Sequence, residues 1–369
     1  MTKPVFVLLH GMGNHSAPVI DSEHPENSKR GSFGDEFVDC MNKAMKSYPG
    51  LAGKKIEDLV EIEEIHYNAY FDALREKLAD QANDISEVLN ASGGGTLNLI
   101  PGVIEEILDL QSSFNDDDDK YTHWLDVLIY KTELGEKARI DAMMRFVEIL
   151  EKHNSENIHV IAHSLGTGIA HDGLHKLYSS QFENIDARIH PQTHKLGSIW
   201  LIANVSPLLN SVLELTSPHD SLVKPSQGGD GICMDMYNIN HQYDPFTWFA
   251  PFTPKRGTWI PNSTYDRHYL SLEPKNTYKA LVHGIDHYLM DPLVHQAILL
   301  KILSDDEYPA DDELQAALDK HRAGSINAHT AKIKETFEGL NLSDADDFSN
   351  FMKAIKIYIE LAKEMGEEI

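Results

Sequence analysis

The sequence predicts an α/β protein in which helices flank a mostly parallel central sheet. Short apolar runs with the length of buried strands alternate along the chain with longer stretches whose apolar residues recur at helical spacing. Residues 5–9 form the first strand-like run, residues 33–48 the first helical stretch, and residues 59–67 the next strand. This order of elements is typical of the α/β class.

The alternation continues after residue 130. The predicted elements there are helices over residues 137–153, 169–178 and 293–303, strands over residues 158–163, 198–205 and 234–239, and a last strand within residues 269–282. A chain of 369 residues can bury a full core, and it suits one large α/β domain with additions, or two domains.

A serine between small residues marks the point where one strand passes into a helix. In the stretch from residue 158 to residue 171, Ala162, Ser164 and Gly166 have the spacing of the G-x-S-x-G nucleophile elbow, with Ala in place of the first Gly. His163 directly precedes the serine. Such a turn strains the serine backbone, and small residues on either side prevent a collision between strand and helix. The motif predicts a nucleophile; the alternative is a strand that simply ends in a Ser-Gly turn.

A glycine-rich loop follows the first strand. It consists of His10, Gly11, Met12 and Gly13, and the glycines allow a positive φ and leave the backbone bare. Together with the serine motif downstream, this loop resembles the α/β-hydrolase family. The resemblance implies that Met12 or a close neighbour supplies one oxyanion N–H. The Leu165 N–H, at the start of the helix after the serine, is expected to supply the other.

The resemblance also implies an acid and a base after the serine, in the order Ser, acid, His. Asp244 follows the strand after next from the serine, where the family has its acid, and Asp220 and Asp235 are the next candidates. The base is His283 or His287. We favour His283, because it comes directly after an apolar run and suits a residue projecting from the last strand, whereas His287 lies on the approach to the next helix.

These residues predict a serine hydrolase of the esterase or lipase type, which cleaves an ester-type bond through a Ser-His-Asp triad and an acyl-enzyme intermediate. The expected substrate is a small-molecule or lipid ester, and carboxylester, lipid, thioester and amide bonds all stay open. Residues 246–265, rich in Trp, Phe and Pro, form either the lining of an acyl pocket or an ordered surface loop. The alternative functions are a binding protein that keeps the fold without the activity, and a metal-dependent hydrolase.

Histidine pairs four residues apart are the basis of the metal alternative. The chain has 20 His, and the pairs with the spacing of metal ligands on a helix are His159 and His163, His171 and His175, His190 and His194, and His283 and His287. No pair carries the Glu of the H-E-x-x-H pattern. We therefore expect no metal and no cofactor.

The α/β pattern breaks between residues 72 and 130. A polar helix is followed by a glycine run at residues 93–95, an apolar patch at residues 97–104 and four consecutive aspartates at residues 116–119. This combination predicts an inserted cap or lid. A helical excursion packed on the core is the alternative.

The domain organisation follows from these segments. Residues 1–304 are expected to form the α/β-hydrolase-like domain, with residues 72–130 as its insertion. Residues 305–369 are acidic and helical without a chemical motif. This extension is open to packing, to a partner surface, or to a homo-oligomer formed through its helices.

Composition limits the partners. Lys and Arg total 32 against 58 Asp and Glu, and the formal net charge of −26 disfavours nucleic acid and anionic membrane surfaces. Cys40 and Cys233 are too few for a disulfide framework, and the N-terminus has no basic region or cleavage site before its first strand. No apolar run has the length of a transmembrane segment. These features predict a cytoplasmic protein.

Overall fold

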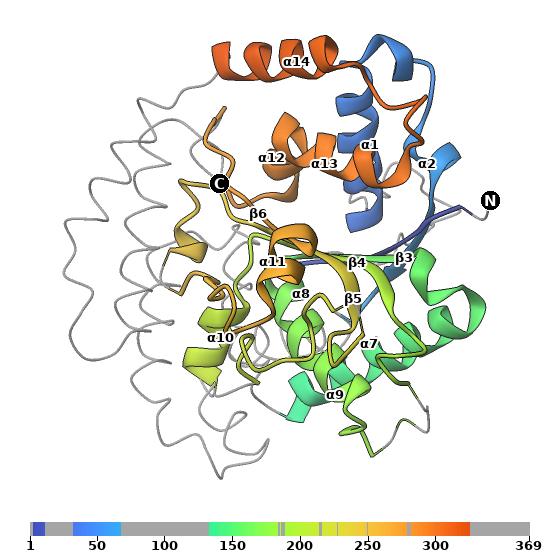
Figure 1. The fold of residues 1–369 in the computed structure, drawn as a ribbon, viewed down its shortest axis with the longest axis vertical. Helices are drawn as coiled ribbons and strands as arrows, with labels where there is room; N and C mark the ends of the chain where they lie inside the picture. Colours follow the sequence, from blue (N-terminus) through green and yellow to red (C-terminus); the bar gives the residue numbers. More distant parts are fainter. Residues whose placement is uncertain are drawn as a thin grey trace, which may run out of the picture.

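A parallel sheet runs through the middle of the molecule (Figure 1). The computed structural model describes residues 3–11, 32–67, 133–183, 185, 189–213, 216–226, 228–248, 250–278 and 282–324. Within them, six strands pair in the order β2-β1-β3-β4-β5-β6, and every neighbouring pair is parallel. The strands are β1 (Val5–Leu9), β2 (Glu61–Ile65), β3 (Ile158–His163), β4 (Leu196–Ile202), β5 (Cys233–Ile239) and β6 (Tyr269–Leu272). The predicted α/β class with a parallel sheet is thereby confirmed.

Helices cover both faces of the sheet (Figure 1). One face carries α7 (Glu133–Lys152), the continuous helix α8 (Leu165–Gly168), η5 (Ile169–Gly173) and α9 (Leu174–Tyr178), and α10 (Ser206–Leu213). The other face carries α1 (Phe33–Met45), α12 (Ile285–Met290), α13 (Pro292–Ile302) and α14 (Asp311–Ala323). Shorter elements are α2 (Ile56–Leu59), α11 (Asn262–His268), η2 (Pro49–Leu51), η4 (Ser155–Asn157) and η6 (Pro245–Thr247).

The position of β1 explains its unbroken apolar sequence. Val5, Val7 and Leu9 pack into the core on the α7 side, while Phe6 and Leu8 pack into the core on the α1 side. Successive side chains of a strand point to opposite faces of the sheet. A central strand covered on both faces therefore needs an apolar residue at every position.

The strand order brings the ends of β1 and β3 together. The chain passes from β1 to β2 on one side and then returns to β3 on the other side of β1. The carboxyl ends of the strands at such a reversal are where open α/β sheets bind ligands. Leu9 of β1 pairs with Ala162 of β3, so Gly11, shortly after β1, lies against the turn after β3.

Helix α8 approaches the end of β1 so closely that residue 166 has no room for a side chain. A Cβ atom on Gly166 would lie 2.4 Å from the carbonyl oxygen of Leu9 and 2.5 Å from that of His10. Both are backbone atoms of a buried segment, which cannot turn aside as a flexible side chain can. Gly166 thus permits the close packing of the helix on the strand.

Several element boundaries differ from the predicted ones. The last strand ends at Leu272, and Pro274, which has no N–H for a strand ladder, follows shortly after it. The prediction that His283 projects from a strand end is therefore wrong. His283 lies in a loop directly before α12. The helix predicted from residue 169 already begins at Leu165, and the strand predicted from residue 59 begins at Glu61, after the short helix α2.

The aromatic segment over residues 246–265 packs partly into the core. Phe252 and Trp259 are buried, and their rings meet edge to face with 5.6 Å between centroids. By contrast, α11 at the end of this segment buries none of its residues. The segment is therefore only in part a surface loop, and its role in binding an acyl group stays a prediction.

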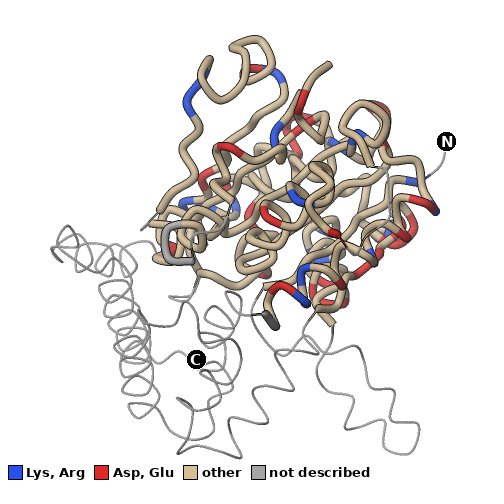
Figure 2. Tube along the Cα trace, turned by 90° about the horizontal axis from the view of Figure 1, so that it is seen from below, with Lys and Arg blue, Asp and Glu red and all other residues tan. Residues whose placement is uncertain are grey.

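Some predictions fall outside the described residues. Met12, Gly13, the insertion over residues 72–130 and residues 325–369 are among these, so the lid, the domain boundary and the oligomer stay predictions. Helix α14, within the predicted C-terminal extension, packs on α13. No helix of the described ranges is both long and apolar enough to cross a membrane. Over the described ranges, Lys and Arg residues lie near Asp and Glu residues (Figure 2).

Gly166→Ala is expected to destabilise the fold, because the added methyl group must push α8 away from β1. Overpacking of this kind costs about 1–3 kcal/mol of unfolding free energy, which urea denaturation measures. Gly50→Ala is the matched control, because nothing lies within 4 Å of a Cβ at that position. Equal stability of the two variants would show that the close approach of helix and strand is not required.

Candidate active site

Ser164 lies on a strained turn directly after β3. Its φ of 52° and ψ of −124° are unusual for a residue other than glycine, and such strain costs of order 1–3 kcal/mol. The Ser164 N–H donates to the Ile202 carbonyl at 3.0 Å, and the Ser164 carbonyl accepts from the N–H and the hydroxyl of Thr167 at 2.8 and 2.6 Å. The Thr167 hydroxyl also accepts from the Val205 N–H at 3.1 Å. The surrounding backbone thus holds the strained turn, as is common at functional sites.

The loop after β1 comes close to this serine. A Cβ atom on Gly11 would lie 2.8 Å from the Cβ of Ser164, so this position requires glycine. The buried ring of His10 stacks on Tyr67 with 4.0 Å between centroids, and the Tyr67 hydroxyl donates to the His10 carbonyl. Tyr67, which follows β2, thereby holds His10 at the start of this loop.

Leu165 is the first residue of α8. Its N–H therefore has no acceptor within the helix. A helix N-terminus favours negative charge. This N–H, adjacent to the serine, can stabilise an oxyanion that forms there.

Three of the predicted residues form a continuous line of hydrogen bonds. The hydroxyl oxygen of Ser164 lies 2.7 Å from Nε2 of His283, and Nδ1 of His283 lies 2.8 Å from Oδ2 of Asp244. An ionised carboxylate can only accept, so Nδ1 carries the proton of the neutral imidazole and Nε2 accepts from the serine hydroxyl. The three residues come from the turn after β3, the loop after β5 and the loop before α12.

Asp244 is fully buried, and several donors hold its carboxylate. Oδ2 accepts from His283 and from the Tyr288 hydroxyl, the latter at 2.6 Å, while Oδ1 accepts from the Phe246 N–H at 3.0 Å. Burial alone would raise the pKa of this carboxyl, but the charge of His283 and these hydrogen bonds outweigh it and lower the pKa of Asp244. The carboxyl group is therefore ionised at neutral pH.

His283 is held by its neighbours while its ring stays accessible. Its backbone carbonyl accepts a hydrogen bond from Nε2 of His163 at 2.8 Å. Its ring stacks on Phe246 with 4.1 Å between centroids, and 19% of the side chain remains exposed. His287 instead lies within α12, where its ring packs edge-on to His241 at 5.0 Å. Of the two candidate bases, His283 is the one that the structure places against the serine hydroxyl.

The other candidate acids lie elsewhere. Asp235 sits in the first half of β5, where it pairs with Lys301 and, at 2.9 Å, with His268. Asp220 is exposed in the loop after α10. The site lies beyond the opposite, carboxyl end of β5, so Asp244 is the carboxylate that reaches it.

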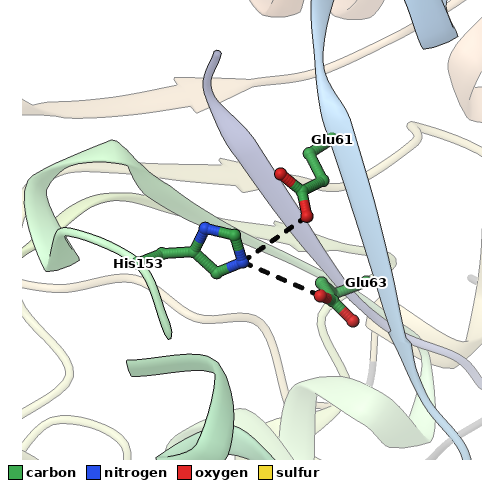
Figure 3. A group of neighbouring side chains, drawn as sticks. All are labelled: Glu61, Glu63 and His153. Carbon is green, nitrogen blue, oxygen red and sulfur yellow. Dashed lines mark ion pairs between the residues drawn. The ribbon is translucent and has the colours of Figure 1, made fainter. Parts of the chain in front are cut away.

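One group within the described ranges has the composition of a metal site, and it lies at the far end of the sheet. Glu61 and Glu63 of β2 and His153 after α7 point towards one another (Figure 3), with Nε2 of His153 at 3.6 and 3.7 Å from the carboxylates. Lys152 contacts the same two carboxylate oxygens, and Arg145 lies 3.0 Å from the other oxygen of Glu63. These cations already neutralise the carboxylates. We therefore assign the group to an ion-pair network that ties α7 to the edge strand, where charged residues also oppose pairing with another chain.

Two of the four histidine pairs have a spacing or a hydrogen bond that does not favour a shared ion. His159 and His163 lie on a strand, where residues four apart are separated by about 13 Å, too far to share an ion. Nδ1 of His159 lies 2.7 Å from the hydroxyl of Ser198. In the helical pair His171 and His175, Nδ1 of His175 accepts a backbone N–H at 3.1 Å.

Three residues that contact the site were not assigned a role from the sequence. Phe246 stands two positions after Asp244, where an Asp side chain often accepts the backbone N–H, and this spacing is a usable signal. Tyr288 follows His283 by five positions, within the next helix. Tyr67 has no local signal, because only the pairing of β1 with β2 brings it to the loop.

No protein-family model matches this sequence, and a search of the curated proteins found no match.

His171, on the helix after the serine, is expected to make the protein sensitive to acid. Among the described residues, neither of its buried ring nitrogens has a hydrogen-bond partner. Burial, with a smaller contribution from His219 and His175, lowers its pKa to about 3 from the ordinary 6.5. As the pH falls, residue 171 is therefore protonated in the unfolded chain before it is protonated in the folded protein. The contribution of neutral His171 to the free energy of unfolding is complete above pH 6.5. It falls by up to about 1.4 kcal/mol per pH unit as the pH drops towards 3.

His171→Leu should flatten that slope, which urea unfolding at a series of pH values measures. His190→Gln, at an exposed histidine, is the control and should leave the slope as in the wild type. A His171→Leu slope equal to that of the wild type would contradict the assignment.

Proposed function

We propose that this protein is a serine hydrolase that cleaves an ester-type bond, in a carboxylester, a lipid or a thioester, through an acyl-enzyme intermediate. The observation that carries the proposal is the line of hydrogen bonds from Asp244 through His283 to Ser164, which ends on a serine with a positive φ. A nucleophile, a base within hydrogen-bond reach and an acid that orients the base are the parts that such chemistry needs.

In the proposed reaction, Nε2 of His283 accepts the hydroxyl proton as Oγ of Ser164 attacks the carbonyl carbon of the substrate. Asp244 keeps the imidazole in the required tautomer and stabilises its protonated form. The Leu165 N–H stabilises the oxyanion, and Met12 is the proposed second donor. His283 then protonates the leaving alcohol or thiol. In the second half of the reaction, His283 takes a proton from a water molecule as this water attacks the acyl carbon, and it returns the proton to Oγ of Ser164 as the bond to the acyl group breaks and the carboxylic acid leaves.

The alternative is a binding protein that keeps this fold without the activity. The strained serine counts against it, because a turn that costs free energy is unnecessary for binding alone. The partly exposed ring of His283 also counts against it, since a purely structural histidine needs no access from solvent.

Ser164→Ala is expected to abolish both ester hydrolysis and covalent labelling by a serine-reactive phosphonate. Loss of a triad member typically leaves only ~10³–10⁴-fold catalysis over water. Ser198→Ala is the matched control, because Ser198 also lies 2.7 Å from a histidine but is buried within β4 and lies on no turn. A chromogenic ester series of increasing acyl length gives the rates. Wild-type turnover in Ser164→Ala would refute the serine mechanism.

His283→Ala should lose at least about 10³-fold in kcat/KM, whereas His287→Ala should stay within about tenfold of the wild type, because only the former removes the base next to the nucleophile. Both variants are assayed on one activated ester. Full activity in His283→Ala together with collapse in His287→Ala would reassign the base.

A further inference from the structure

Two hydrogen-bond partners determine where the hydroxyl proton of Tyr288 points. It accepts from the backbone N–H of His241 at 3.0 Å, and it lies 2.6 Å from Oδ2 of Asp244. An N–H can only donate, so the single hydroxyl proton of Tyr288 points at Asp244. Because Tyr288 is fully buried, water does not compete for this arrangement.

This hydrogen bond falls on the carboxylate oxygen that also serves the base. Oδ2 of Asp244 accepts both from Tyr288 and from Nδ1 of His283, while Oδ1 accepts from the Phe246 N–H. Each donor draws on the negative charge of the carboxylate, and a hydrogen bond to the ionised form favours that form. The charge that Oδ2 offers to His283 is therefore smaller than in a carboxylate held by His283 alone.

We propose that Tyr288 is a positioning residue that acts through Asp244, and that its hydroxyl weakens the hold of the carboxylate on the proton of His283. The consequence, which rests on the proposed function, is that His283 stays a free base at lower pH than it otherwise would. Tyr288 thereby extends the pH range of the proposed hydrolysis to lower pH.

The other titratable groups around the pair do not replace this contact. His163 of β3 meets the backbone carbonyl of His283 rather than its ring nitrogens. His241, in the loop after β5, directs Nε2 towards the Asn276 carbonyl, and burial lowers its pKa. His287 of α12 packs edge-on to His241, and Asp291 at the start of α13 pairs with His321.

The experiment compares two tyrosine variants. Tyr288→Phe should move the acid limb of the kcat/KM profile upward by roughly half to one pH unit, because the carboxylate then holds the His283 proton more firmly. Tyr48→Phe is the matched control: Tyr48 is also fully buried in the core on the α1 side, and its hydroxyl lies 2.7 Å from Nε2 of His295. It should lose comparable thermal stability and leave the acid limb in place.

A histidine-ring NMR titration provides a readout that needs no turnover. The His283 signal, assigned by its loss in His283→Gln, should titrate at higher pH in Tyr288→Phe than in the wild type. An unchanged or lowered midpoint would overturn the role of Tyr288. If the wild type neither hydrolyses esters nor reacts with the phosphonate, the proposed function fails, while the NMR titration still decides the inference on Tyr288.

Discussion

The positive φ of Ser164 is held by backbone contacts from three directions, and the geometry of the site depends on it. β4 accepts the serine N–H, Thr167 holds the serine carbonyl, and the β1 loop lies against the turn at a glycine. With a relaxed turn, the side chain would not occupy the place where His283 meets it at 2.7 Å. The glycines at positions 11 and 166 are therefore part of the site although neither carries a functional group.

The buried carboxylate of Asp244 is a second constraint. An isolated charge in a core would be costly, and this one remains ionised because it accepts hydrogen bonds on both oxygens. One short segment supplies much of that compensation, since His283 directly precedes α12 and Tyr288 lies within it. The packing of α12 beside α1, on the same face of the sheet, therefore positions His283 and stabilises the ionised carboxylate of Asp244 at the same time.

The fold class was predictable because the buried strands carry their own signal. β1 is apolar at all five positions and β3 at four of six, since both faces of the sheet are covered. Boundaries were predicted less well. Val282 is apolar and buried but lies outside the sheet, because β6 has already ended before Pro274. Periodicity registers burial, and burial alone does not distinguish a strand from a packed loop.

For the site, the sequence by itself determined the nucleophile candidate and its neighbours, because the steric demands of a strand-turn-helix serine are local and leave small residues at fixed spacing. It also favoured Asp244 as the acid and left two histidines as candidates for the base. Only the tertiary structure decided which of these meets the serine. Positions 164, 244 and 283 come together only after the chain has made the three connections from β3 to β4, from β4 to β5 and from β5 to β6. The contacts of Tyr67 and Tyr288 were decided there as well, because hydrogen bonds between segments far apart in the chain leave no pattern in either one.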